Sequence, residues 1–350
     1  MGTTITQRDY GTLADGQVVR EYRLVSAQGL TLTAINLGGI VTGLWVPDAH
    51  GASANVVLGF DNLDDYAQRN PHFGAIIGRY GNRIAGGRFE LDGKRHQLAQ
   101  NDGMNCLHGG KPGFGGRFWG AEIDGESLVF SLDSADGDQG FPGRLQAHVR
   151  YSLGHDERSW RIDYEATCDA PTVVNLTHHD YFNLAGHGSV MRHRLTLPAS
   201  RYSEVDPQLI PLRHAPVEGT PFDFRQPTAI VARIREPHPQ LQHGRGYDHN
   251  WLLDAPVDGS LRLAATLEDP ASGRRMEVLT TEPALQFYSG NFLDGTLRGC
   301  GGEFYRQGDG LCLETQHSPD SPNHSASEDW PSTVLRPGET YRSSTVHRFT

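Results

Sequence analysis

Two neighbouring segments of the chain alternate apolar and polar residues with a period of two. Residues 145–153 read LQAHVRYSL, and residues 160–168 read WRIDYEATC. Because successive side chains of a β-strand point to opposite faces of a sheet, this period is typical of a strand with one buried face. A short segment, GHDER, separates the two. Together they predict an antiparallel β-hairpin.

The same pattern recurs along the chain. It appears in residues 88–98, RFELDGKRHQL, and in LRLAATLED, where Leu261, Leu263, Ala265 and Leu267 should share one face. Asp-Gly pairs favour hairpin turns because both residues tolerate positive φ. Such pairs begin at Asp15, Asp92, Asp124, Asp136, Asp258, Asp294 and Asp309, among others.

Helical periodicity is scarce in this sequence. NLDDYAQRN, at residues 62–70, is one candidate short helix. Strands separated by turns, without alternating helices, favour an all-β fold, which we expect to be a large antiparallel β-sandwich with few short helices. The Pro-rich run over residues 207–227 carries the apolar anchors LIPL and PFDF, so we interpret it as an ordered excursion over one domain spanning residues 1–350.

Composition excludes several classes of protein. The net charge of −11 argues against a nucleic-acid partner, which would need a basic face. The sequence has no apolar run of roughly 18 residues that could span a bilayer, and its first twenty residues lack the pattern of a secretory signal. We therefore expect a cytoplasmic protein. The four cysteines form no C-x-x-C pair, which favours free thiols.

A histidine pair stands in PTVVNLTHHDYFNLAG, where the apolar residues before it indicate a strand. Neighbours in a strand point to opposite faces, so His178 and His179 cannot both enter one pocket. Neither H-E-x-x-H nor a Cys/His cluster is present, so no metal site is expected. One of the two histidines should be functional, although an adjacent pair could also arise by chance among 17 histidines.

Three further segments carry candidate polar groups, each with an ordinary structural alternative. In NDGMNCLHGG, His108 precedes two glycines that let the backbone approach a ligand closely. In GRYGNRIAGGRF, Asn82 and Arg83 lie between glycine-rich turns, and the guanidinium suits sugar hydroxyls or a carboxylate as well as loop contacts. In HGRGYDHNWLL, Asp248 enters an apolar strand and could be a turn or capping residue.

Glu314 is the least ordinary residue of the chain. In GDGLCLETQHSPDSPN it lies in the middle of an alternating segment, with Leu311 and Leu313 on one face and Cys312 and Gln316 on its own face. Burying an unpaired carboxylate is costly, so such a placement suggests a function.

Seven motifs together carry a resemblance to a known family. They are GNRI, CLHGG, PTVVNLTHHDYFNLAG, YDHNW, QFYSGNFLDG, GLCLETQHSPDSPN and LRPGETY. In their order and approximate positions they resemble the aldose 1-epimerase family from about Gly78 to the C-terminus, and INLGGIVTGLWVPD near the N-terminus is also similar. The resemblance implies a single large antiparallel β-sandwich, which agrees with the pattern of strands and turns.

The resemblance also implies roles for individual residues. The family's catalytic histidine falls on His179, and its catalytic base falls on Glu314. Many relatives have Asn at the position of His178. The sugar-holding residues of the family fall on four further positions, Arg83, His108, Asp248 and Gln286, and we add Asn82 beside Arg83.

The implied reaction interconverts the α and β anomers of a free aldose such as galactose or glucose. We expect Glu314 to be ionised at neutral pH and to take the C1 hydroxyl proton. His179 should protonate the ring oxygen, with its pKa raised by an acidic pocket, and His108 should donate a further hydrogen bond. The reaction needs no cofactor and no metal. The partner is a small monosaccharide, and the protein should be a monomer or a homodimer.

Three alternatives stay open at this point. A glycoside hydrolase could use Asp248 and Glu314 as its two carboxylates. A non-catalytic sugar-binding protein could share the scaffold, because fold does not fix function. An epimerase of sugar phosphates would need a basic cluster in its pocket.

Overall fold

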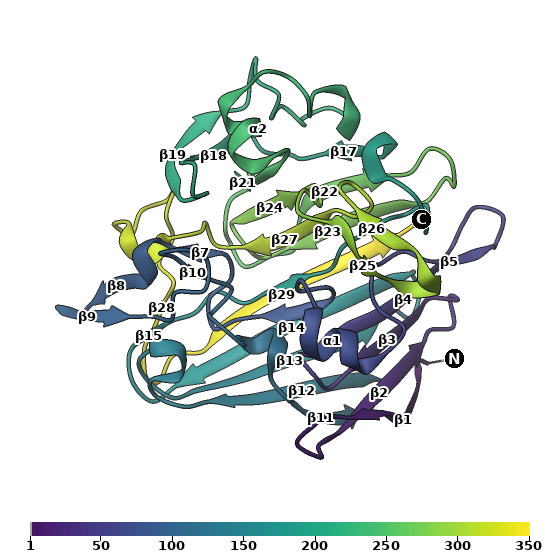
Figure 1. The fold of residues 1–350 in the computed structure, drawn as a ribbon, viewed down its shortest axis with the longest axis horizontal. Coiled ribbons are helices and arrows are strands. Elements are labelled where there is room, and N and C mark those ends of the chain that lie inside the picture. The colour runs from purple at the N-terminus through teal and green to yellow at the C-terminus, as the bar shows by residue number, and fades with distance from the viewer. Residues whose placement is uncertain (1) are drawn as a thin grey trace.

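The computed structural model describes residues 2–350. Three large sheets dominate it, and the ladders within them are antiparallel. The widest has nine strands, seen running diagonally through Figure 1. In spatial order these are β11 (Gly120–Asp124), β12 (Ser127–Ser134), β13 (Leu145–Leu153), β14 (Ser159–Cys168), β29 (Tyr341–Phe349), β23 (Arg275–Thr280), β22 (Arg262–Glu268), β17 (Arg194–Thr196) and β20 (Thr228–Ala229).

Two five-stranded sheets accompany it. The N-terminal sheet follows chain order, with β1 (Thr4–Thr12), β2 (Val18–Val25), β3 (Thr31–Ile35), β4 (Val41–Pro47) and β5 (Ser53–Asn55). The second sheet holds β19 (Pro211–Pro216), β18 (Arg201–Val205), β21 (Asp248–Leu252), β24 (Ala284–Tyr288) and β27 (Cys312–Gln316), in that order.

Short pairs and two helices complete the fold. The pairs are β6 (Ala75–Ile77) with β16 (Thr177–His179), β7 (Arg83–Ile84) with β10 (Cys106–Leu107), β8 (Arg88–Leu91) with β9 (Lys94–Gln97), β15 (Thr172–Val173) with β28 (Val334–Leu335), and β25 (Asp294–Arg298) with β26 (Phe304–Arg306). The helices are α1 (Leu63–Arg69) and α2 (Pro239–Gly244).

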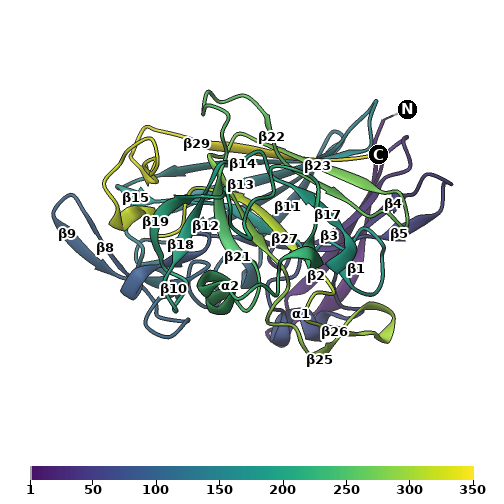
Figure 2. The ribbon, with the colours of Figure 1, turned by 90° about the horizontal axis from the view of Figure 1, so that it is seen from above.

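One large hydrophobic core joins the sheets. It includes Trp160 from β14, Leu44 from β4 and Phe287 from β24, all fully buried. Seen from above, β14, β22, β23 and β29 lie along one side of the molecule, and α1, α2, β25 and β26 lie on the other (Figure 2). The all-β antiparallel sandwich expected from the sequence is confirmed.

The local predictions are mostly confirmed. The hairpin over residues 145–168 forms as β13 and β14, with Val149 opposite Tyr164. The helix at residues 62–70 forms as α1, where the Asn62 side chain accepts a hydrogen bond from the Asp65 N–H. The Pro-rich segment is ordered, since Phe222 and Phe224 are buried.

Two expectations about strands and turns need correction. The Asp-Gly pairs at Asp15, Asp92 and Asp124 connect hairpins, whereas Asp294 begins a strand, Asp136 lies in a longer hairpin loop, and Asp258 and Asp309 lie between strands that do not pair with each other. In β22 the register shifts between Leu263 and Ala265. This bulge breaks the alternation, so the expected common face is wrong for the first two of its four residues.

Two expectations concerned the cysteines and membrane-spanning segments. The four cysteines are free thiols, as expected. No helix within residues 2–350 is long and apolar enough to cross a membrane.

Candidate active site

The strands β21, β24 and β27 carry a row of polar side chains on one face of their sheet. Asn250, Gln286 and Glu314 lie directly opposite one another in the ladders. Asp248 is two residues before Asn250 on β21, and Cys312 is two residues before Glu314 on β27, so both share this face. The sequence prediction for the Glu314 face is therefore confirmed, and all five residues are buried.

The opposite face of these strands is mostly apolar. Phe287, which neighbours Gln286, is fully buried and stacks on Tyr247 with ring centroids 5.2 Å apart. Trp119 is also fully buried, and its indole N–H donates to the Phe114 carbonyl. Both aromatic rings therefore pack in the core, and neither offers a stacking surface for a sugar.

The histidine pair on β16 divides between two environments. The His179 Nε2 atom lies 3.7 Å from Glu314 Oε1. His178 points the other way, with Nδ1 2.6 Å from Asp180 Oδ2 and Nε2 2.7 Å from the Tyr151 hydroxyl. The alternation predicted from the sequence is confirmed, since one imidazole faces Glu314 and the other is held in the core.

His108 reaches the site from the loop after β10. Its Nδ1 accepts a hydrogen bond from the Asn82 backbone N–H at 3.2 Å, so the proton of the neutral ring is on Nε2. The His108 ring lies 5.1 Å from that of His179, centroid to centroid. Asn82 and His108 both have positive φ, 63° and 52°, a conformation that costs a non-glycine residue free energy and clusters at functional sites.

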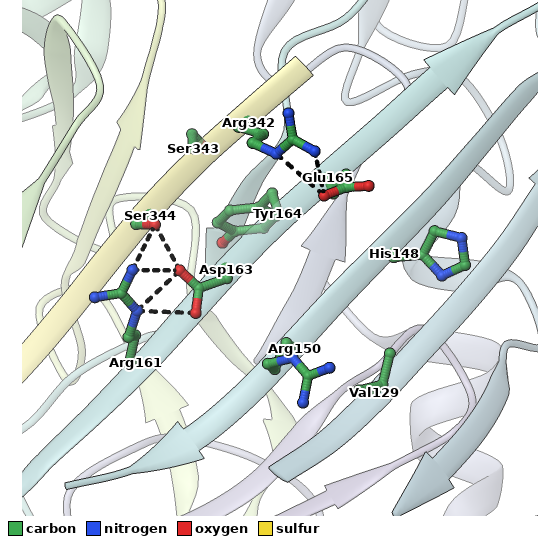
Figure 3. Close-up of a pocket in the computed structure, with 10 residues that line it drawn as sticks. All are labelled: Val129, His148, Arg150, Arg161, Asp163, Tyr164, Glu165, Arg342, Ser343 and Ser344. Atoms are coloured by element: carbon green, nitrogen blue, oxygen red, sulfur yellow. Dashed lines mark hydrogen bonds and ion pairs between the residues drawn. The ribbon is translucent and has the colours of Figure 1, made fainter. Parts of the chain in front are cut away.

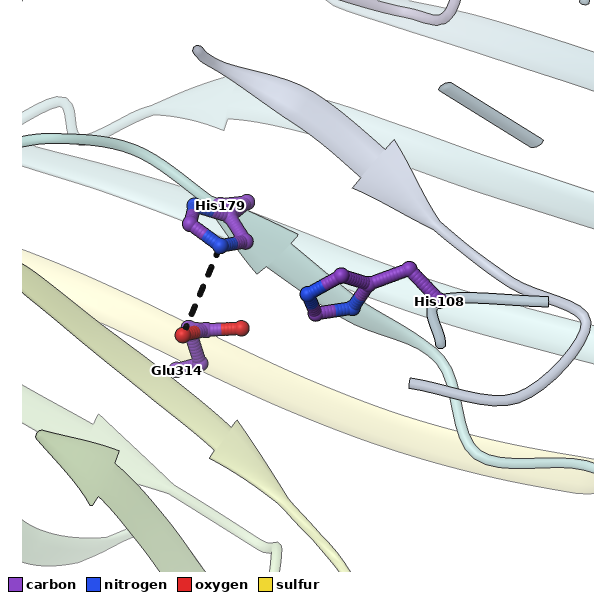
Figure 4. Close-up of side chains that lie close together, drawn as sticks. All are labelled: His108, His179 and Glu314. Atoms are coloured by element: carbon purple, nitrogen blue, oxygen red, sulfur yellow. Dashed lines mark ion pairs between the residues drawn. The ribbon is translucent and has the colours of Figure 1, made fainter. Parts of the chain in front are cut away.

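Figure 4 shows His108, His179 and Glu314 converging from three different segments. One donor atom from each lies within 4.8 Å of the others. Two imidazoles and a carboxylate are the residues here that could hold a metal ion such as Zn²⁺. The same three groups can also transfer protons to and from a small molecule bound between them.

The expected sugar-holding groups surround this centre. Arg83 Nε donates to Asp102 Oδ2 at 2.8 Å, which fixes its guanidinium. Gln286 Nε2 donates to Asp248 Oδ1 at 2.7 Å. Within residues 2–350, the buried atoms Gln286 Oε1 and Glu314 Oε2 have no hydrogen-bond partner. Unpaired buried oxygens are costly, so these two atoms are acceptors available to a ligand.

Burial changes the protonation expected from the sequence. It raises the pKa of Glu314 well above the ordinary value, and the nearby Asp248 carboxyl raises it further. Burial also lowers the pKa of His179 well below 6.5, and His72 lowers it further. The expectation of a raised His179 pKa is therefore wrong, and burial also opposes the ionised form of Glu314 that the sequence predicts, because desolvation favours the uncharged form of each group.

Two residues near His179 were not singled out as functional from the sequence. The His72 ring lies 5.5 Å from the His179 ring and 4.7 Å from the His108 ring, centroid to centroid. Cys312 Sγ lies 3.5 Å from His179 Nδ1. The alternation of β27 already placed Cys312 on the face of Glu314 and could have indicated it. His72 follows Asn70-Pro71 outside any periodic segment, so no local pattern pointed to it.

A separate hollow lies on the outer face of the nine-stranded sheet, and two of its arginines pair with carboxylates that also line it. Figure 3 shows Arg161 bonded to Asp163, and Arg342 bonded to Glu165. None of the residues of the candidate site lines it. The hollow is therefore distinct from the site around Glu314.

Comparisons with known proteins show the family to which the chain belongs. The family model for aldose 1-epimerase matches residues 20–348. The chain is 43% identical to the galactose mutarotase of Rattus norvegicus over 350 residues, covering 99% of this chain and 98% of that protein. It is 41% identical to the aldose 1-epimerase of Escherichia coli (strain K12), with 96% of each chain covered.

Solved structures give the same result. The galactose 1-epimerase of Lactobacillus acidophilus superposes with a TM-score of 0.86 at 28% identity, covering 100% of this chain and 99% of that one. An aldose epimerase homologue from C. elegans superposes with a TM-score of 0.84 at 30% identity, covering 93% and 97%. The chain belongs to the aldose 1-epimerase family.

Proposed function

We propose that this chain interconverts the α and β anomers of free aldohexoses such as galactose and glucose. One observation carries the proposal: Glu314 and His179, far apart in the sequence, meet at 3.7 Å while Glu314 Oε2 stays buried without a partner within residues 2–350. An acid and a base held at this spacing can act on the two oxygens attached to C1 of a pyranose. The names of the relatives, galactose mutarotase and aldose 1-epimerase, agree with it.

Anomer exchange requires ring opening, rotation and ring closure. Glu314 takes the proton of the C1 hydroxyl while His179 gives a proton to the ring oxygen, and the C1–O5 bond breaks. The resulting aldehyde turns about the C1–C2 bond. Both proton transfers then run in reverse and close the ring from the other face. Because the acid and the base are already positioned beside the sugar, neither has to be recruited from solvent for the proton transfers.

The remaining polar groups fit the hydroxyls of the sugar. Asp248 and Gln286 are already hydrogen-bonded to each other, and Arg83 is held by Asp102. Side chains fixed in this way lose little conformational entropy when a sugar binds. A sugar that lacks a matching hydroxyl leaves them without a hydrogen-bond partner. His108, with its proton on Nε2, can donate a hydrogen bond to the sugar ring. The Asn82 backbone N–H holds His108 in place.

Polarimetry on freshly dissolved α-galactose and α-glucose tests this function. We expect the parent protein to accelerate the change in optical rotation, and Glu314→Gln or His179→Ala to lower kcat by about 10²–10⁴-fold each. His148→Ala, on the outer sheet face, is the control and should change nothing.

Two results would contradict the proposal. If optical rotation changes at the same rate with and without the protein, the chain is a sugar-binding protein without catalytic activity. Release of a reducing sugar from a disaccharide, abolished by Asp248→Asn, would instead favour the hydrolase.

We propose several broader properties with it. Free thiols agree with a reducing, cytoplasmic environment. The chain acts on a small monosaccharide as a monomer or a homodimer, without a metal or cofactor, and without nucleic-acid or membrane partners. It forms one domain over residues 1–350, which agrees with the position of the C-terminal strand β29 between β14 and β23.

A further inference from the structure

His72 lies beside two histidines of the candidate site and is not used by the mechanism above. Its ring is close to the rings of both His108 and His179, at the centroid distances given earlier. Within residues 2–350 the ring makes no hydrogen bond to the protein, and the residue is only partly buried. The imidazole therefore has donor and acceptor capacity that the chain itself does not use.

The backbone fixes His72 in this position. Its φ is 73°, a left-handed conformation that it shares with Asn82 and His108 at the same site. Asn70 closes the loop around it, because the Asn70 Oδ1 atom accepts from the Phe73 N–H at 2.7 Å. The Tyr181 hydroxyl donates to the Pro71 carbonyl at 3.2 Å. A costly conformation held by several contacts is typical of a residue kept for a ligand.

The position of His72 relative to the reacting atoms indicates which part of the sugar it meets. In the proposed function Glu314 acts at C1 and His179 acts at the ring oxygen. His72 is beside the two imidazoles but outside the group of mutually close donor atoms that includes Glu314. The ring oxygen is bonded to C1 and to C5, so the side away from Glu314 is the C5 side, which carries the C6 hydroxymethyl group of a hexose.

We propose that His72 is a specificity-determining residue that hydrogen-bonds the C6 hydroxyl of aldohexoses. This inference rests on the proposed function. Pentoses and 6-deoxy sugars lack this hydroxyl and would leave the imidazole unpaired. The chain should therefore prefer galactose over 6-deoxygalactose, and glucose over xylose, with His72 responsible for that preference.

The test compares matched sugars on matched variants. His72→Asn keeps a residue that tolerates positive φ but shortens the side chain, and His72→Phe keeps an aromatic ring but removes both nitrogens. Each variant should raise KM for galactose about fivefold and leave KM for 6-deoxygalactose unchanged, as loss of one hydrogen bond predicts. His72→Gln, which keeps a donor at similar reach, should retain part of the preference.

The ratio of kcat/KM values for galactose and 6-deoxygalactose is the decisive quantity, because an effect of His72 on His179 would change both sugars alike. A ratio that stays at the parent value in His72→Asn, with an unchanged thermal unfolding midpoint, overturns the inference. If His72→Phe does not fold, the Asn variant decides alone. A parent protein without anomerase activity would instead remove the proposed function, so the two failures are distinguishable.

Discussion

At the scale of single residues, Glu314 and His179 together carry one proton throughout the proposed reaction. Before ring opening His179 is protonated and Glu314 is ionised. After His179 has given its proton to the ring oxygen and Glu314 has taken the proton of the C1 hydroxyl, Glu314 is protonated and His179 is neutral. Burial favours the uncharged form of each group, which is the pair that accompanies the open-chain aldehyde. Burial thus lowers the free energy of the uncharged pair relative to the charged pair.

The pH dependence of kcat/KM follows from this shared proton. A second proton inactivates the pair and binds to His179, whose pKa is lowered by burial, by His72 and by His178. A lowered pKa keeps the imidazole neutral to a lower pH, so kcat/KM should stay constant as pH falls to 6.5 and decline only below it. His72→Asn removes one neighbouring imidazole and should move this decline to higher pH. Polarimetric rates from pH 4 to pH 8 check this, and a midpoint at or above 6.5 in the parent would contradict it.

Sequence alone identified most of the residues that meet at the site but not the directions of their pKa shifts. His179, Glu314, His108 and Asp248 could be selected because a motif or an alternating strand sets the direction of each side chain. A pKa depends on how much water surrounding segments exclude, which no local pattern records. His72 was missed for a related reason, since a loop conformation at positive φ brings it to the other imidazoles.

At the scale of secondary structure, alternation predicts the strands well, but a bulge can reverse it. In β22 the register shift after Leu263 leaves that side chain 39% exposed, whereas Leu267 is fully buried. A bulge inserts one residue into one strand of a pair, so the faces exchange beyond it. The segment LRLAATLED shows two equivalent leucines, because the bulge arises only when this strand pairs with β23.

These two leucines should therefore differ in their contribution to stability. Leu267→Ala leaves a cavity in the core and should lower the free energy of unfolding by about 2–5 kcal/mol. Leu263→Ala, at a solvent-facing position, should lower it by less than about 1 kcal/mol. Urea unfolding followed by circular dichroism measures both. Similar losses in the two variants would show that the alternation continues unbroken through the strand.

At the scale of the whole molecule, a buried polar network connects the sheets beneath the site. Glu282, in the turn between β23 and β24, has Oε2 2.6 Å from His317 Nδ1 after β27. Its Oε1 accepts from the Tyr341 hydroxyl at the start of β29, at 3.0 Å. The same hydroxyl lies 3.4 Å from the backbone nitrogen of Leu176, shortly before β16. This one carboxylate therefore links the nine-stranded sheet, the sheet of Glu314 and the segment that leads to His179.

The network should make global stability depend on pH. Burial alone would raise the pKa of Glu282, but His317 and hydrogen bonds from His317, Tyr341 and Ser343 outweigh it and lower the pKa. A lowered carboxyl pKa contributes stability that is present above about pH 4.5 and is lost as pH falls through the folded-state pKa. Glu282→Gln should lower the free energy of unfolding by about 3 kcal/mol at pH 7, and the difference from the parent should narrow toward pH 3.

Glu122→Gln, at an exposed position, is the control, and its free energy of unfolding should stay within about 0.5 kcal/mol of the parent at every pH. A Glu282→Gln loss of the same size at pH 7 and pH 3, measured by urea unfolding, would show that the charge of Glu282 does not stabilise the network.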